Sequence, residues 1–279
     1  MRSLTVREAA TGGREPQPGN APAMTVARYR FIGEELPPVE ETLSLGELAR
    51  QYLQGIYGRL HQGAASPILS GRAADGSVIK GHRHAFYLPT DEDGDGKIDH
   101  LTIFARGERE ARSGSEAGRD LGFGQPELQA LDQFTRLRQL GRQAQLRLVL
   151  LALGSADELS GVPLLGPAKR WRSATPFVPP RHQKFRGKTR ENPPDQLCDE
   201  MVKRGLPRPA SLKLLPRCLR ADGSIPWAAF RLERLRGQGN RGQGYAYGFE
   251  IELAEPLAGP LAFGYGAHFG LGLFVAPPS

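Results

Sequence analysis

The order of strand-like and helix-like segments in the first half of the chain is the feature that most restricts its fold. A strand-like run is followed by a helix-spaced segment, two extended segments, a second helix and a fourth strand. These segments cover residues 25–32, 43–60, 67–72 together with 78–88, 98–106, 125–137 and 146–153. The order β-α-β-β-α-β is that of the ferredoxin-like split unit, so the sequence predicts an α+β fold built on it.

The second half is less regular. It contains one short helix pattern, at 194–204, and several strand patterns, at 171–180, 210–217, 228–235 and 245–253. We interpret it as a second, degenerate ferredoxin-like unit that ends in a glycine-rich loop. The predicted organisation is a flexible N-terminal arm at 1–23, a first ferredoxin-like domain at 24–154 and a second domain at 155–279.

Composition excludes several classes of protein. With 39% hydrophobic and 24% charged residues among 279, the chain is typical of a folded protein rather than a disordered one. It has no apolar run of about 18 residues, so a transmembrane helix is not expected. Two cysteines are too few for a disulfide scaffold. The polar N-terminus has no signal-peptide core, and a cytoplasmic location is expected.

The positive charge is concentrated in one stretch. Residues 168–241 carry 18 Lys/Arg and 6 Asp/Glu, a net charge of +12, whereas the whole chain carries +7. Such a field favours a polyanionic partner, most often a nucleic acid. Aromatic residues lie among the basic ones, and Trp171, His182 and Phe185 are candidates for stacking on bases. The candidate RNA-binding cations are Lys169, Arg170, Arg172, Arg181, Lys184, Arg186, Lys188 and Arg190.

Three of the six histidines lie close together in the sequence. His82 and His84 are two residues apart on an extended segment and therefore share a face. In a hairpin that pairs even with even positions, His100 joins that face, but the sequence does not fix the register. The three could bind zinc, supply a general acid and base, or be structural.

The segment between these histidines resembles the start of a calcium-binding loop. Residues 91–99 have carboxylates at loop positions 1, 3, 5 and 9 and glycine at position 6. The twelfth position, however, is Thr102 rather than a glutamate. We interpret the segment as a solvated acidic hairpin turn, with a weak calcium or magnesium site as the alternative.

A glycine-rich segment near the C-terminus is the most distinctive motif. Four glycines in nine residues could bring backbone N–H groups close to a phosphate, or could form a structural turn between core strands. The candidate RNA-binding residues of this loop are Gly264, Gly266, His268, Gly270 and Gly272.

Taken together, these segments resemble a known family. A late glycine-rich loop after a ferredoxin-like unit resembles the RAMP proteins of CRISPR systems. More closely, the chain is similar to the repeat-cleaving half of the fused backbone-cap and endoribonuclease subunit of type I-G (formerly I-U) effectors. The segments that carry this similarity are Gly81-His82-Arg83-His84-Ala85-Phe86-Tyr87-Leu88-Pro89, the turn at 91–100, Trp171-Arg172-Ser173-Ala174-Thr175-Pro176-Phe177 and residues 259–274.

The resemblance implies cleavage of CRISPR precursor RNA within each repeat, on the 3′ side of a stem-loop, without metal or cofactor. Its partners would be the repeat stem-loop and other effector-complex subunits, with no membrane. The catalytic candidates are His84 and His100, then His82; His268, His61 and Tyr57 are rivals. Two alternatives stay open: a non-catalytic hairpin-binding subunit, and a metal-dependent phosphodiesterase using His82 and His84 with His100 or the acidic turn.

Overall fold

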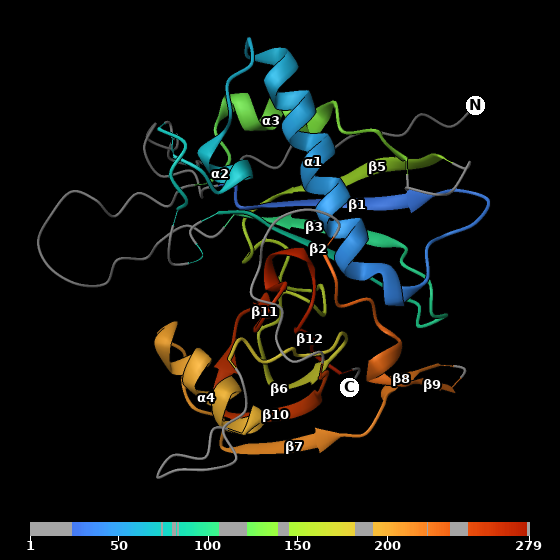
Figure 1. The fold of residues 1–279 in the computed structure, drawn as a ribbon, viewed down its shortest axis with the longest axis vertical. Helices are drawn as coiled ribbons and strands as arrows, with labels where there is room; N and C mark the ends of the chain where they lie inside the picture. Colours follow the sequence, from blue (N-terminus) through green and yellow to red (C-terminus); the bar gives the residue numbers. More distant parts are fainter. Residues whose placement is uncertain are drawn as a thin grey trace, which may run out of the picture.

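The chain folds into two five-stranded antiparallel sheets, one from each half, that lie one above the other (Figure 1). This computed structural model describes residues 24–73, 75–79, 82, 84–105, 122–138, 145–181, 192–221, 223–234 and 245–277. The expected N-terminal arm, residues 1–23, lies outside them. No helix within the described part of the chain is both long enough and apolar enough to cross a membrane.

The first sheet has the strand order β2-β3-β1-β5-β4. Its strands are β1 (Val26–Ile32), β2 (Phe86–Thr90), β3 (His100–Phe104), β4 (Arg136–Arg138) and β5 (Gln145–Gly154), and its helices are α1 (Thr42–Leu60), the short α2 (Pro67–Ser70) and α3 (Gln125–Asp132). Without the edge strand β4, this is the order of the ferredoxin-like unit, as predicted.

One face of this sheet carries the core. Ala27, Tyr29 and Phe31 alternate along β1 and are buried together with apolar residues of α1 and α3. The buried hydroxyl of Tyr29 donates to the carbonyl oxygen of Leu131 at 2.7 Å, which attaches β1 to α3. The even-numbered residues of β1 therefore point to the opposite face.

The second sheet has the order β11-β12-β6-β10-β7. Strands β12, β6, β10 and β7 repeat the ferredoxin-like order, but only one of the two helices, α4, is present; β11 and a glycine-rich turn occupy the place of the other. The elements are β6 (Ala168–Ser173), α4 (Pro193–Lys203), β7 (Ser211–Leu215), the hairpin β8 (Cys218–Arg220) and β9 (Gly223–Ile225), β10 (Gly248–Leu257), β11 (Leu261–Ala262) and β12 (Leu273–Val275), with short 3-10 helices η1 (Val39–Glu41), η2 (Trp227–Ala229) and η3 (Ala267–Phe269).

Three local predictions were wrong. Residues 67–70, expected to be extended, form α2, because the Ser66 side chain accepts from the backbone N–H of Leu69 and so caps a helical turn. No strand is found in the described residues 228–234 of the strand expected at 228–235, and the 3-10 helix η2 covers the start of that segment. Trp171, expected to stack on RNA bases, is fully buried, and its ring N–H donates to the Ala168 carbonyl at 3.0 Å.

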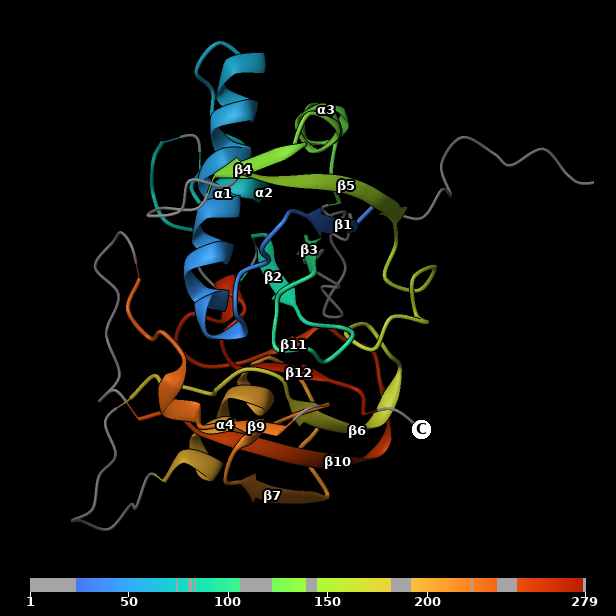
Figure 2. The same cartoon turned by 90° about the vertical axis from the view of Figure 1, so that its right-hand side faces the viewer.

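The two halves share buried apolar clusters, while a further cluster around Trp171 lies within the second half alone. Trp227, Phe269 and Leu271 from the second half pack in the same cluster as the helices of the first half. The halves approach closely at Gly46 of α1, where an added Cβ would lie 2.7 Å from the carbonyl oxygen of Phe269. Figure 2 shows η3 and its flanking turn below α1 and beside β2.

Candidate functional site

Three imidazole rings from opposite ends of the chain stack on one another. His82 and His84 lie just before β2, and His268 lies in η3. The ring centroids of His84 and His268 are 3.8 Å apart with an interplanar angle of 18°, and Phe86 stacks on His268 at 4.0 Å. His82 Nδ1 and His268 Nε2 are 2.8 Å apart, a hydrogen-bond distance. We refer to His82, His84 and His268 as the histidine cluster.

The glycine-rich turn sets the position of His268. Gly266 and Gly270 flank η3 with φ values of 73° and 89°, a left-handed conformation that glycine adopts without strain. A Cβ at Gly270 would lie 2.7 Å from the Thr42 side chain, so the turn is packed tightly against the start of α1. The sequence therefore places one histidine of the second half against two of the first.

One backbone carbonyl fixes the tautomers of two of these rings. Nδ1 of His84 lies 3.3 Å from the carbonyl oxygen of Ala85, and Nδ1 of His268 lies 3.2 Å from the same oxygen. A carbonyl can only accept, so each Nδ1 carries the proton and donates it. The proton-accepting nitrogen of both neutral rings is therefore Nε2, which on His268 faces Nδ1–H of His82.

Burial keeps the rings of His84 and His268 neutral at pH 7. It lowers the pKa of His84 to about 4, with a smaller opposing effect from the bond to Ala85. Burial also holds the pKa of His268 well below its usual value, and the neighbouring rings of His84 and His82 lower it further. At neutral pH both His84 and His268 can accept a proton.

A positively charged pocket of about 580 Å³ opens beside the cluster. His84 and His268 form one wall, and Arg50, Arg72 and Arg234 supply the charge. The remaining lining residues are Gln54, Ser70, Gly71, Val78 and Phe269. The site thus combines neutral imidazoles with three guanidinium groups, which suits an anionic substrate.

Neighbouring groups hold two of the arginines in place. Arg50 donates to the carbonyl of Ser70, and burial lowers the pKa of its guanidinium. Arg234 Nε lies 2.5 Å from a carboxylate oxygen of Glu47, and its guanidinium lies 4.8 Å from the ring centre of Phe269. Local sequence patterns gave no signal for Arg50 and Arg72, because α1 and the segment after α2 meet only in the fold.

The hairpin has the register in which His100 shares a face with His82 and His84, but it does not place His100 beside them. The β2–β3 hairpin does pair even with even positions, but His100 is opposite Thr90, six residues beyond His84. At about 3.3 Å per residue, the two histidines are roughly 20 Å apart along the hairpin. They can neither share one zinc ion nor act on one phosphate.

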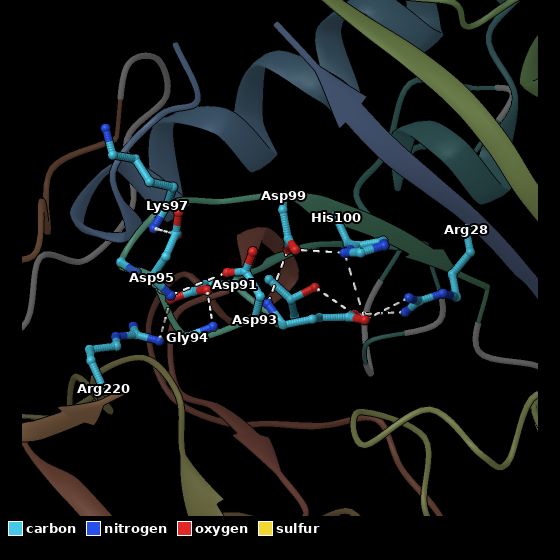
Figure 3. A network of polar contacts seen from close by, with 12 residues as sticks. Arg28, Asp91, Asp93, Gly94, Asp95, Lys97, Asp99, His100 and Arg220 are labelled. Atoms are coloured by element: carbon cyan, nitrogen blue, oxygen red, sulfur yellow. Dashed lines mark hydrogen bonds and ion pairs between the residues drawn. The ribbon is translucent and has the colours of Figure 1, made fainter. Parts of the chain in front are cut away.

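His100 belongs instead to a polar network at the far end of the hairpin (Figure 3). Its Nδ1 lies 2.9 Å from Asp99 and 3.7 Å from Glu92, and Glu92 accepts two hydrogen bonds of 2.8 Å from Arg28. The surroundings of His100 are therefore those of a structural ion pair rather than of a pocket.

The loop that resembles a calcium site connects the two halves. Asp91 accepts from the backbone N–H groups of Gly94 and Gly96, and its buried carboxylate is 3.0 Å from Arg220 of the β8–β9 hairpin. Oxygens of Asp91, Asp93 and Asp95 lie within 4.8 Å of one another. The guanidinium of Arg220 already provides the positive charge next to Asp91 (Figure 3).

The glycine-loop residues do not present their N–H groups as the phosphate-binding hypothesis requires. The N–H of Gly264 donates to Glu200, that of Gly270 to Ala267, and that of Gly272 to Pro176. At Gly266 an added Cβ would meet the side chains of Leu43 and Leu271. These glycines pack against protein, and His268 is the member of the predicted set that faces the pocket.

The predicted RNA-binding cations fall into two groups. Lys169, Arg170 and Arg172 lie on β6, where Arg172 pairs with Glu250 at 2.7 Å and the exposed Lys169 lies 3.8 Å from Glu255. Arg181 lies 3.5 Å from Asp199. Lys184, Arg186, Lys188 and Arg190, as well as the aromatic candidates His182 and Phe185, lie outside the described residues.

The rival pair Tyr57 and His61 occupies a different place. Their rings are 4.4 Å apart at the end of α1, and His61 Nε2 lies 3.4 Å from the carbonyl of Pro126. Eleven helical positions separate Arg50 from His61, or about 16 Å of helix. The pair therefore lies away from the histidine cluster.

The sequence matches no family model and no curated protein. Among solved structures, the chain is similar to a RAMP protein described as binding different RNA substrates, with 13% identity, a TM-score of 0.42 and coverage of 91% of this chain and 100% of that one. It is also similar to a Cas6 product complex (16% identity, TM-score 0.37, 91% and 99% covered) and to a CRISPR-associated Cas6 protein (10% identity, TM-score 0.38, 92% and 100% covered).

Proposed function

We propose that this protein is an endoribonuclease that cleaves CRISPR precursor RNA within its repeats and needs no metal ion. The observation that carries the proposal is the histidine cluster beside a pocket lined by three arginines. RNA can be cut by its own 2′-hydroxyl when a base, an acid and positive charge converge on one phosphate. The cluster and its pocket supply these groups.

In the proposed reaction the ribose 2′-oxygen attacks the adjacent phosphorus as its proton passes to a base. The bond from phosphorus to the 5′-oxygen breaks, and an acid gives that oxygen a proton. The products are a 2′,3′-cyclic phosphate and a 5′-hydroxyl, so one proton is taken up and one is released. No external oxidant or nucleophile is required.

The roles follow from the hydrogen bonds of each ring. His84 is the proposed base, because its proton is held on Nδ1 by Ala85 and its pKa of about 4 keeps it neutral. His82 is the proposed acid. His268 is a positioning residue, since its Nε2 accepts from Nδ1 of His82 and its Nδ1 donates to Ala85.

Arg50, Arg72 and Arg234 would stabilise the charge that develops on the phosphate. Guanidinium groups make paired, charge-assisted bonds with phosphate oxygens, and they act most strongly where water is excluded. The sequence resemblance supplies the choice of CRISPR repeats as substrate. It also suggests that the protein keeps the 3′ stem-loop and joins an effector complex.

The experiment is incubation of the full chain with a labelled CRISPR repeat hairpin in excess EDTA, followed by analysis of the product ends. We expect one cut with a 2′,3′-cyclic phosphate and a 5′-hydroxyl. His84→Ala should reduce the cleavage rate by about 10²-fold or more and leave hairpin binding intact. His61→Ala and His100→Ala are the matched controls and should cleave as the wild type does.

Three results would contradict the proposal. Tight binding without any cut would indicate a hairpin-binding subunit. Cleavage that returns only after a divalent metal is added would indicate a metal-dependent phosphodiesterase. Loss of cleavage in His61→Ala, with His84→Ala fully active, would place the chemistry at the end of α1.

A further inference from the structure

Four arginines share an exposed face of the first sheet, on the side opposite α1 and α3. The register places Arg136 opposite Arg147 and Arg30 opposite Val149, so the side chains of each pair project from the same face. Arg138 lies on the same side of β4 as Arg136. All four side chains are exposed. We call Arg30, Arg136, Arg138 and Arg147 the arginine face.

No carboxylate of the described residues neutralises this face. Within the described ranges, no Asp or Glu forms an ion pair with Arg30, Arg136, Arg138 or Arg147. The contrast is with Arg28, two residues before Arg30 on the same side of β1, which is buried and makes a bidentate pair with Glu92. The unpaired charge is thus confined to the exposed part of the sheet.

The placement of Arg136 opposite Arg147 is unfavourable for the isolated protein. Residues directly opposite on antiparallel strands have Cβ atoms only about 5 Å apart, and like charges there are destabilising. A bound polyanion removes this repulsion, because phosphates would lie between the guanidinium groups.

The arginine face is a separate place from the histidine cluster. His84 precedes β2 at one edge of the sheet, and β4 forms the other edge. Four strand spacings of about 4.8 Å separate these edges, and Arg30 lies toward the opposite end of the strands. The two sites are therefore more than about 20 Å apart, and one phosphate cannot reach both.

We propose that the arginine face binds the phosphate backbone of single-stranded RNA, as a second contact for the substrate outside the cleavage pocket. The choice of RNA rests on the proposed function; the choice of a polyanion rests on the four unpaired guanidiniums. The planar guanidinium of arginine can form two parallel hydrogen bonds with the oxygens of one phosphate, whereas the ammonium group of lysine cannot. Exposed Ile32 and Val149 lie among the arginines and offer apolar contact to sugars and bases.

The test is binding of a fluorescein-labelled oligouridylate of about 30 nucleotides, measured by anisotropy at several salt concentrations. For single strands, the slope of log affinity against log salt is about 0.7 per phosphate contact. Replacing three arginines (R136Q/R138Q/R147Q) should reduce that slope by about 2 and weaken binding at low salt roughly tenfold or more. K203Q/R208Q/K213Q, which removes three exposed charges from the second half, is the matched control and should bind almost as the wild type does.

The proposal on the arginine face fails if the triple arginine variant keeps the wild-type slope and affinity, or if the control variant loses as much. It also fails if the wild type does not bind the oligouridylate. Cleavage of the isolated repeat hairpin at saturating protein separates the two proposals. The triple arginine variant should still cut it, whereas failure of the wild type to cut would contradict the proposed function alone.

Discussion

The ring of His84 lies against a residue that has no side chain. Gly71, at the end of α2, has φ of 71°, and a Cβ added there would lie 2.7 Å from Cδ2 and 2.9 Å from Nε2 of His84. The glycine therefore serves both the backbone turn and the placement of the ring. The orientation of the His84 imidazole therefore depends on the absence of a side chain at Gly71.

Gly71→Ala should therefore reduce cleavage, because the new methyl group displaces the His84 ring. Gly63→Ala is the matched control: its φ of 87° imposes similar backbone strain, but an added Cβ has no neighbour within 4 Å. Both variants should lose about 1 kcal/mol of stability, and only Gly71→Ala should lose activity. Equal cleavage by the two, at matched folded fraction, would contradict this role for Gly71.

The low pKa of His84 also predicts how stability depends on pH. The ring has a pKa of about 4 when folded and about 6.5 when unfolded, so between these values the unfolded chain binds more protons. The stability that the neutral His84 ring contributes is complete above pH 6.5 and is lost as the pH falls toward 4. Urea unfolding at pH 7.5 and pH 5 should show a loss of stability that is smaller by about 2 kcal/mol in His84→Gln than in the wild type. His61→Gln should keep the wild-type difference.

The histidine cluster shows which part of the site can be predicted from the sequence and which part cannot. The pair His82 and His84 could be found because residues two apart on an extended segment are neighbours whatever the rest of the chain does. The sequence did not show which further histidine lies beside that pair. His100 was favoured because it is near in sequence, whereas His268, 183 residues from Ala85, is brought in by packing of η3 on β2.

At the scale of elements, the turn between β2 and β3 holds the two halves together. The ion pair of Asp91 and Arg220 is buried on both sides, and the N–H of Ala221 donates to the carbonyl of Gly94 at 3.2 Å. The spacing of the acidic residues at 91–99 predicted a turn, but it did not indicate that Arg220 forms an ion pair with Asp91. That arginine comes from a hairpin more than a hundred residues later.

Arg220→Ala should lower the free energy of unfolding by about 3 kcal/mol, because it leaves the Asp91 carboxylate buried without its cation. Adding Asp91→Asn to this variant should restore part of the loss, since the unpaired charge is then removed. Arg217→Ala, an exposed arginine bonded to Ser224 in the same hairpin, is the control and should change stability by less than about 1 kcal/mol. Chemical denaturation of the wild type, Arg220→Ala, Asp91→Asn, their double variant and the Arg217→Ala control measures these differences. An additive loss in the double variant would contradict the coupling.

At the scale of the whole molecule, the sequence predicted both ferredoxin-like units but not how they meet. Hydrophobic periodicity identified the main strands and helices of the first half and α4, β7 and β10 of the second, because an amphipathic face is set by residues close together in the sequence. It did not predict the β8–β9 hairpin. The contact between the halves depends on isolated residues such as Trp227, Phe269 and Leu271. These residues lie in irregular segments that show no hydrophobic periodicity. The pocket lies at this contact, so its lining could not be deduced either.

The shared core predicts that the protein unfolds in one cooperative transition. Two apolar clusters contain buried residues of both halves, so unfolding of one half exposes apolar residues of the other, although the cluster around Trp171 lies in the second half alone. Tryptophan fluorescence, which reports on Trp171 and Trp227 in the second half, and far-ultraviolet circular dichroism should give coincident midpoints. Two separated transitions would show that the halves are independent.

His82 and His268 are hydrogen-bonded although 186 residues separate them in the chain, and this has a consequence for protein synthesis. A ribosome completes His82 long before it reaches His268, and the later residue must then dock with its turn before the rings can stack. If the cluster cleaves RNA as proposed, the nascent chain carries no complete nuclease while it is still attached to a machine built of RNA. On that proposal, the order of residues along the chain would keep the translating ribosome and its message from being cut by the protein being made.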